Sequence, residues 1–138
     1  KYQKWDKKSP IKIVTHHWSP NWMKGFDIYK LLDDKVTAGI DGHKIEFEYI
    51  GNVCKDVDLK NTKVKPPKSG KELADDLVKN HIYVTGSINE PAGLHHIEGC
   101  LCGLPVLYRK SGALPEYCGW KRNARCRHRL SLKRCWRF

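Results

Sequence analysis

Residues 90–106 read EPAGLHHIEGCLCGLPV, and they follow IYVT at residues 82–85. The β-branched run at 82–85 predicts a strand. Pro91 suits the first turn of a helix, and Gly103 ends that helix. The apolar residues 104–108 predict the next strand, which tolerates its proline near the start. A strand, a helix and a strand in this order predict two parallel strands joined by a crossover helix.

The same alternation continues on either side of this segment. Strands are predicted at residues 11–15 and 44–50, and residues 51–68 are expected to be mainly loop. Helices are predicted at residues 26–32, from a capping box at 69–72 onward, and at 113–117. This order predicts an α/β fold, a Rossmann-like parallel sheet with helices on both faces. In such folds ligands bind at the carboxyl ends of the strands.

Length and composition allow one soluble domain. The chain has 138 residues, of which 40% are hydrophobic and 30% charged. No stretch approaches the roughly 20 apolar residues of a membrane span, and the start has no signal-peptide core. The first residue is Lys1, so we expect a fragment or a processed product. Six irregularly spaced cysteines favour reduced thiols in a cytosolic protein over a disulfide scaffold.

The net charge of +11 is concentrated at one end. Residues 121–138 hold eight Lys or Arg and no acid, which leaves +3 for residues 1–120. The chain is therefore divided into a linker at 1–10, a Rossmann-like domain at 11–118 and a basic tail at 119–138. Two interpretations of the tail stay open. A non-native or frame-shifted end is favoured, because the helix–strand pattern stops at mid-fold; a basic nucleic-acid arm is the alternative.

Two glutamates separated by seven residues are the candidate chemistry. Glu90 lies just before the predicted helix and Glu98 about two turns into it, with Leu94, Ile97 and Leu101 as the helix's apolar face. A helix start carries free N–H groups and a partial positive charge, which suit a diphosphate. A glycine at position 93 lets a phosphate approach the backbone, and the carboxylates can accept hydrogen bonds from sugar hydroxyls. The other interpretation is a pair of solvated helix-terminus charges.

The segment at residues 90–106 resembles the E-x7-E motif of retaining glycosyltransferases with the GT-B fold, in particular family 4. The resemblance covers roughly residues 11–118. Its other parts are IVTHHWS at 13–19 with MKGFD at 23–27, YIGN at 49–52, and SGALPE at 111–116. These look like the first strand and phosphate loop, the end of the second strand, and the Gly-Gly-x-Pro-Glu turn of that family's C-terminal, donor-binding domain. The chain is thus expected to be a truncated C-terminal half of a GT-B fold.

The resemblance implies a role for each matching residue. Glu90 and Lys24 are the implied catalytic residues: Glu90 contacts the transferred sugar, and Lys24 neutralises the diphosphate leaving group. The implied donor-binding residues, with Glu98 on the ribose, are Glu98, Gly93, Leu94, His95, Gly51 and Asn52. Ser19 stands where the family often has an arginine. Lys24 as a plain surface lysine and Gly93 as a packing residue are the alternatives.

The implied function is transfer of a sugar from a nucleotide-sugar donor to an acceptor that the sequence does not identify. The acceptor domain is missing, and this fragment alone is expected to be inactive. No cofactor and no metal are expected; at most one of His95 and His96 faces the cleft. The implied location is cytoplasmic, with peripheral attachment to the inner face of the membrane left open.

No specific nucleic-acid partner is expected on this reading. The alternative function is a protein without enzymatic activity that binds nucleic acid or an anionic surface through its basic tail. A third possibility is an inactive, partly folded product. Its melting would be broad rather than cooperative, and it would expose apolar surface.

Overall fold

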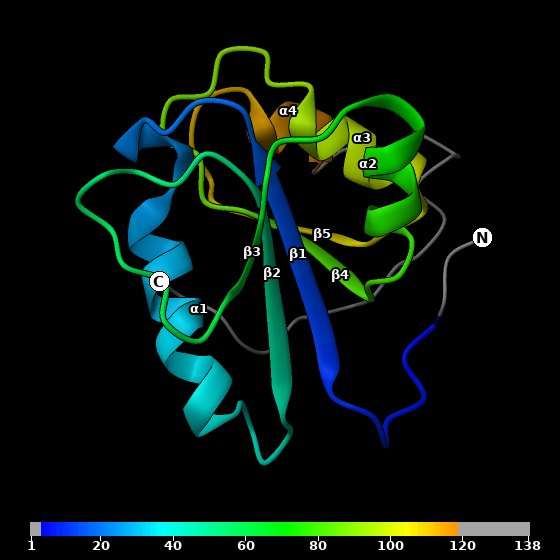
Figure 1. The fold of residues 1–138 in the computed structure, drawn as a ribbon. Helices are drawn as coiled ribbons and strands as arrows, with labels where there is room; N and C mark the ends of the chain where they lie inside the picture. Colours follow the sequence, from blue (N-terminus) through cyan, green and yellow to red (C-terminus); the bar gives the residue numbers. More distant parts are fainter. Residues whose placement is uncertain (1–3, 119–138) are drawn as a thin grey trace.

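The computed structural model describes residues 4–118, and Figure 1 shows their arrangement. Five parallel strands form one sheet in the order β3-β2-β1-β4-β5. They are β1 (Ile11–His17), β2 (Ile45–Gly51), β3 (Lys63–Lys65), β4 (Ile82–Thr85) and β5 (Val106–Tyr108). The helices are η1 (Trp22–Lys24), α1 (Phe26–Ala38), α2 (Gly70–Leu77), α3 (His95–Leu101) and α4 (Leu114–Cys118).

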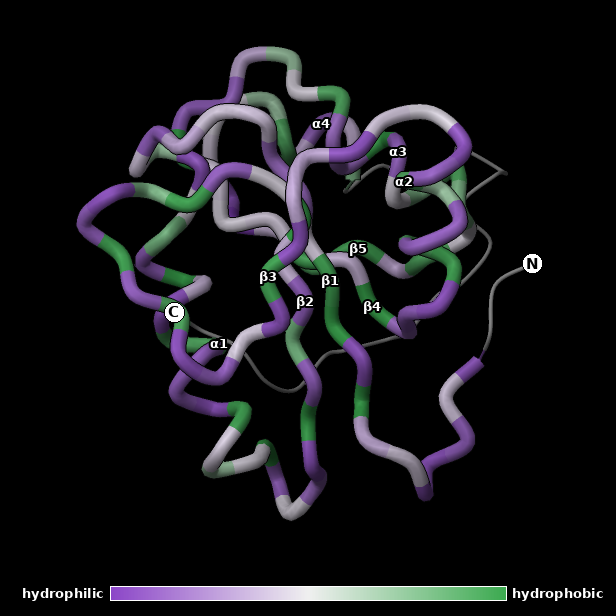
Figure 2. The backbone as a smooth tube through the Cα atoms, viewed as in Figure 1, coloured by the Kyte–Doolittle hydropathy of each residue, from purple (hydrophilic) through white to green (hydrophobic). Residues whose placement is uncertain are grey.

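Helices cover both faces of the sheet, as predicted. Neighbouring strand residues point to opposite faces, so Ile13 and Val14 enter different clusters. One cluster joins Ile13 to Phe26 and Tyr29 of α1. The other joins Val14 to Leu73 and Leu77 of α2, to Tyr83 of β4 and to Leu104, which lies just before β5. Figure 2 shows apolar residues concentrated along β1 and alternating with polar ones along β2.

Three details of the fold differ from the sequence predictions. The predicted loop at 51–68 contains the edge strand β3, which is only three residues long. The capping box does not form: the Ser69 side chain makes no capping hydrogen bond, although its carbonyl accepts one from Leu73 N at 3.4 Å. Helix α3 begins at His95 rather than at Pro91.

The helical face of α3 was also predicted wrongly. His95, His96 and Gly99 are buried, whereas Leu94 and Leu101 are 69% and 78% exposed. The reason is steric and polar. A Cβ added to Gly99 would lie 2.6 Å from the Tyr83 ring, so this close-packed side must carry a glycine. The neighbouring His95 ring finds a hydrogen-bond partner within the sheet.

The predicted linker and tail lie partly or wholly beyond what is described. Residues 119–138, the predicted basic tail, are outside the described residues, as are residues 1–3. Residues 4–10 contain a turn in which Asp6 accepts hydrogen bonds from the backbone N–H groups of Lys8 and Ser9. The Trp5 ring of this turn contacts His43, with ring centroids 5.0 Å apart.

Candidate functional site

The carboxyl end of β1 carries two histidines that organise the site. His16 and His17 are 3% and 4% exposed. The strand was predicted to end at residue 15, with a loop from His16 onward, but it continues through both histidines, which pair with β2 as far as Gly51. It continues because both rings have hydrogen-bond partners inside the protein. The loops that follow β1 and β4 lie above this edge of the sheet in Figure 1.

The first partnership at this edge is an ion pair between Lys24 and Glu90. Lys24 Nζ donates to Glu90 Oε2 at 2.7 Å. The Glu90 side chain is 9% exposed and that of Lys24 27%, so the pair is largely shielded from water. The loops that bear the two residues are also joined by their backbones, because Ile88 N donates to Met23 O at 2.7 Å. The predicted catalytic residues are therefore in direct contact.

Close backbone packing keeps Glu90 in place. A Cβ on Gly93 would lie 2.8 Å from Glu90 Cδ and 2.7 Å from His95 Cε1. On the other side, Gly112 lies against the Glu90 backbone, and Ala113 N donates to Glu90 O at 2.9 Å. The turn at 111–113 thus holds the loop that carries Glu90. Gly93 lies beside both Glu90 and His95, so a side chain at position 93 would collide with both.

Glu98 contacts the other part of the site. It lies in the first turn of α3, and not two turns into the helix as predicted, because α3 starts later. One of its oxygens, Oε2, is 2.8 Å from His16 Nε2. The opposite ring nitrogen, His16 Nδ1, is 3.1 Å from the Tyr83 hydroxyl. The Glu98 side chain remains 47% exposed, so it is accessible to a ligand.

His17 and His95 form the floor between these two parts. Their ring centroids are 4.6 Å apart. His17 Nε2 is 2.6 Å from the Tyr29 hydroxyl, and His95 Nε2 is 2.9 Å from Thr85 Oγ1. His95 and His96 are both buried, so neither faces the solvent. The two ring nitrogens of His96 have no hydrogen-bond partner among the described residues.

Burial keeps these histidines neutral. The pKa of His95 is lowered to about 3, mainly by desolvation and then by the neighbouring His96, His16 and Lys24. Desolvation also lowers the pKa of His17 well below its usual value. The pKa of His16 is lowered by burial as well, although Glu98 opposes that shift. At neutral pH the rings therefore act as hydrogen-bond donors and acceptors, and Lys24 brings positive charge.

The remaining predicted site residues have supporting positions. Gly51 ends β2 against the backbone of His17, where a Cβ would collide with the His17 carbonyl. Asn52 Nδ2 donates to Trp18 O at 2.7 Å, so this side chain ties the ends of β1 and β2 together. Leu94 is the exposed N-cap residue of α3. Leu94 is joined to one of the predicted site residues through its backbone, because Leu94 O accepts a hydrogen bond from Glu98 N at 3.0 Å.

Sequence reasoning missed His16 and His17 as members of the site. Both belong to the segment that resembles the family's first strand, but no role was assigned to them from that resemblance. A usable signal was present: two adjacent histidines directly follow a β-branched run. The carboxyl end of a central parallel strand is where site residues gather in this fold class.

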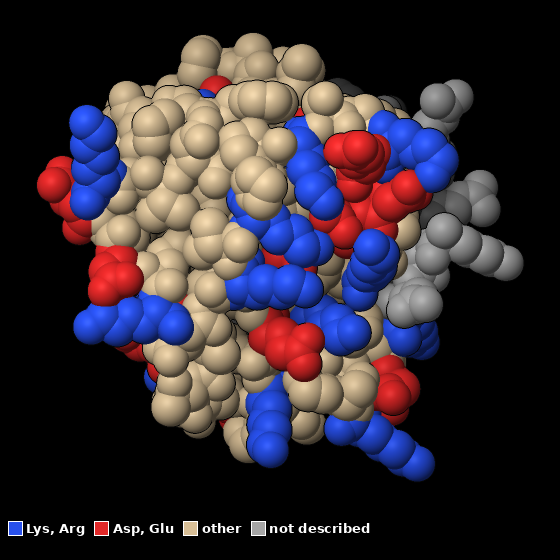
Figure 3. Space-filling model, in the orientation of Figure 1, with Lys and Arg blue, Asp and Glu red and all other residues tan. Residues whose placement is uncertain are grey.

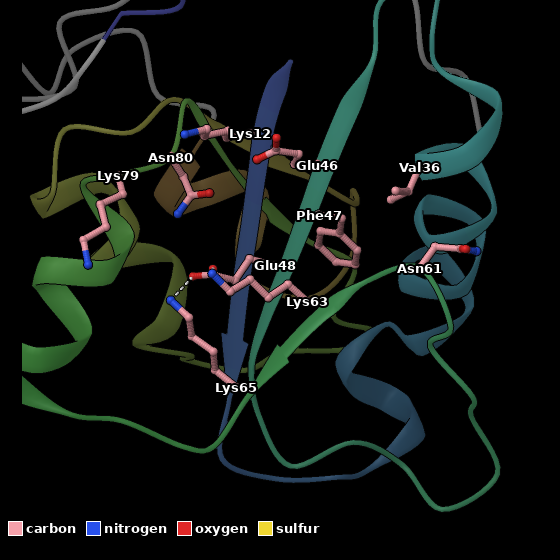
Figure 4. A pocket seen from close by; sticks show the side chains of 10 residues that line it. All are labelled: Lys12, Val36, Glu46, Phe47, Glu48, Asn61, Lys63, Lys65, Lys79 and Asn80. Carbon is pink, nitrogen blue, oxygen red and sulfur yellow. Dashed lines mark hydrogen bonds and ion pairs between the residues drawn. The ribbon is translucent and has the colours of Figure 1, made fainter. Parts of the chain in front are cut away.

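A hollow of about 330 Å³ lies elsewhere, beside the edge of the sheet. Figure 4 shows its lining, which includes Glu48 and Lys65 joined by an ion pair of 2.9 Å. Lys65 also pairs with Asp76, and Figure 3 shows lysines interleaved with acidic residues on this face. Glu48 in its lining pairs with both Lys63 and Lys65, and none of the predicted site residues lines it. We therefore place the candidate site at the carboxyl edge instead.

Two features are absent from residues 4–118. No cluster of three or more His, Cys, Asp or Glu side chains is arranged to hold a metal ion. No helix in this range is both long and apolar enough to cross a membrane.

Comparison with known proteins supports a glycosyltransferase-like fold. The chain matches no family profile. It is 27% identical over 103 residues to the phosphatidylinositol N-acetylglucosaminyltransferase gpi3 subunit of Schizosaccharomyces pombe, covering 67% of this chain and 22% of that protein. The crystal structure of TarM matches 89% of this chain and 26% of its own, with a TM-score of 0.57 and 20% identity. The chain thus spans about a fifth of the curated relative, and its α/β, Rossmann-like sheet is shared with TarM.

Proposed function

We propose that this chain is the donor-binding domain of a retaining glycosyltransferase of the GT-B, family 4 type. The observation that carries the proposal is the Lys24–Glu90 ion pair at the carboxyl edge of the sheet. It places one cation and one carboxylate side by side where ligands bind in this fold class. The glycosyltransferase named among the relatives supports the same class of chemistry.

Each residue has a role in the proposed transfer. The Lys24 ammonium stabilises the charge that develops on the departing diphosphate, and it exchanges its contact with Glu90 for the phosphate oxygens when donor binds. Glu90 accepts hydrogen bonds from hydroxyls of the transferred hexosyl group. Glu98, whose side chain is 47% exposed, accepts them from the ribose. Gly93, Leu94 and His95 line the diphosphate approach.

The proposal includes the surroundings of the reaction. The acceptor would be held by another domain of a longer protein, because this chain covers 22% and 26% of the proteins it matches. The transfer is proposed to be metal-independent, with Lys24 supplying the charge that a cation supplies elsewhere. A cytoplasmic location, with peripheral attachment to the inner face of the membrane, accompanies the proposal.

A melting scan tests donor binding. The chain is heated with UDP, GDP, ADP and their common sugar conjugates, alongside Glu98→Ala and Glu72→Ala. Glu72 is the matched control, because it is an exposed glutamate in the first turn of another helix. One nucleotide should raise the melting temperature of the parent and of Glu72→Ala, and not that of Glu98→Ala. A cooperative melt that no nucleotide shifts would contradict the proposal.

A further inference from the structure

The hydrogen bonds around His16 define which of its ring nitrogens carries the proton. The Tyr83 hydroxyl is 3.1 Å from His16 Nδ1 and accepts from the His16 backbone N–H at 3.4 Å. Burial raises the pKa of Tyr83 well above its usual value, so its hydroxyl stays protonated. His16 Nδ1, at 3.1 Å, is a nearer acceptor for that proton than the His16 carbonyl, at 3.5 Å. The proton of the neutral His16 ring is then on Nε2. Nε2–H points at Glu98 Oε2, 2.8 Å away.

This donor acts on a side chain that otherwise has freedom to move. The Glu98 side chain is 47% exposed, whereas that of His16 is 4% exposed and packed beneath it. The Tyr83 ring contacts the His16 ring edge-on, with centroids 5.6 Å apart. A buried, packed donor therefore holds one oxygen of the accessible Glu98 carboxylate, and in doing so it orients the second oxygen.

We propose that Tyr83 and His16 are positioning residues, which orient the Glu98 carboxylate so that its free oxygen reads the hydroxyls of a bound ribonucleotide. The inference rests on the proposed function and deepens it, because it explains how an exposed glutamate distinguishes a ribose from a sugar that lacks hydroxyls. Neither residue touches the ligand. Both act through Glu98.

The experiment compares affinities for nucleotides with and without ribose hydroxyls. Calorimetric titration measures the dissociation constants of UDP, GDP and ADP and of their 2′,3′-dideoxy counterparts. His16→Gln places an amide N–H where Nε2 lies, whereas His16→Asn reaches only the Nδ1 position. Tyr83→Phe removes the hydroxyl and keeps the buried ring. His81→Gln is the control, because His81 is also a buried histidine that accepts a hydrogen bond, from Lys12 N at 3.0 Å.

The parent and His81→Gln should prefer the ribonucleotide by about tenfold or more, the usual effect of a charge-assisted hydrogen bond. His16→Asn should reduce that preference to about threefold or less, and Tyr83→Phe should reduce it in part. His16→Gln should restore it. A merely structural defect would weaken both nucleotides equally and leave the ratio unchanged.

Two results overturn the inference in different ways. If the parent prefers the ribonucleotide and His16→Asn and Tyr83→Phe keep that full preference, the positioning role is wrong while donor binding stands. If the parent binds none of the nucleotides, the proposed function fails and the inference fails with it.

Discussion

Lys24 Nζ lies 2.7 Å from Glu90 Oε2, although the two residues are sixty-six positions apart in the chain. The loop after β1 and the loop after β4 meet here, so the contact depends on the correct order of the strands. Glu90 is the more buried partner, with 9% of its side chain exposed. A carboxylate this shielded depends on its counter-charge.

Replacing Lys24 by methionine should therefore destabilise the fold. The Glu90 carboxylate would stay largely buried without its counter-charge, which we expect to lower the free energy of unfolding by about 2 kcal/mol. The double variant Lys24→Met with Glu90→Gln should recover much of that loss, because the uncompensated charge is gone. Urea unfolding measures both. Lys71→Met, which removes an exposed pair with Asp75, is the control and should change little.

The same lysine variant bears on ligand binding. If Lys24 contacts the diphosphate, Lys24→Met should weaken a nucleoside diphosphate about tenfold or more and weaken the free nucleoside little. Titration with each ligand gives this ratio. Equal affinity of parent and variant for the diphosphate would remove Lys24 from the proposed site.

The two glutamates of the site show how much of it could be predicted from the sequence. Glu90 and Glu98 were both chosen from spacing and resemblance, and both lie at the carboxyl edge. Their local setting was not foreseen. Helix α3 starts at His95 because residues before it are tied to the turn at 111–113, a contact between distant segments that local sequence does not encode.

The alternation of strands and helices was predictable because β-branched runs alternate with helical spacing. The short β3 was not, because KVK in a polar loop gains its pairing only from the neighbouring β2. The apolar face of α3 was misjudged for a related reason. Periodicity identifies apolar residues, but the side of α3 that packs on the sheet is decided by two contacts. The Tyr83 ring leaves room only for a glycine at position 99, and Thr85 offers a hydrogen-bond partner to His95.

Gly25 follows β1, and its backbone packs directly against Gly86, which follows β4. Position 25 should therefore tolerate no side chain. It has a φ of 101°, and an added Cβ would collide with the Gly86 backbone. Gly25→Ala should lower the free energy of unfolding by about 3 kcal/mol, from both strain and overlap. Gly42→Ala is the matched control: its φ is 78°, but nothing lies within 4 Å of the added Cβ. That variant should lose about 1 kcal/mol, the cost of the backbone conformation alone. Equal losses in the two variants would show that the loops can separate freely.

Asp33 should be the most sensitive carboxylate of α1. It is 0% exposed and accepts from Asn61 N at 2.8 Å and Thr62 Oγ1 at 2.6 Å, which holds the segment leading into β3. These hydrogen bonds lower its pKa, although burial opposes that shift. In Asp33→Asn the remaining oxygen can still accept from Asn61 and Thr62, but the amide N–H would face Lys60 N, which donates to Asp33 Oδ2 at 3.2 Å. The variant should therefore cost about 2–3 kcal/mol in urea unfolding. The adjacent Asp34 is exposed, and within residues 4–118 it pairs with Lys30 on its own helix, so Asp34→Asn should change stability far less.

Acid should destabilise the protein before its carboxylates titrate, because of the buried histidines. The pKa of His95 is lowered from 6.5 to about 3, mainly by burial and then by His96, His16 and Lys24. The unfolded chain therefore binds a proton that the folded chain does not, so stability present above pH 6.5 is lost as the pH falls from 6.5 toward 3. Each such histidine contributes a slope of up to about 1.4 kcal/mol per pH unit.

His95→Gln isolates that contribution. Glutamine can keep the contact with Thr85 Oγ1, which is 2.9 Å from His95 Nε2, but it takes up no proton. Urea unfolding at a series of pH values between about 6.5 and 4 should give a shallower loss of stability in His95→Gln than in the parent, by up to one proton's worth of slope. Parallel pH profiles for the two proteins would mean that His95 is protonated in the folded state. The claim that the buried histidines beneath Lys24 and Glu98 are neutral would then be wrong.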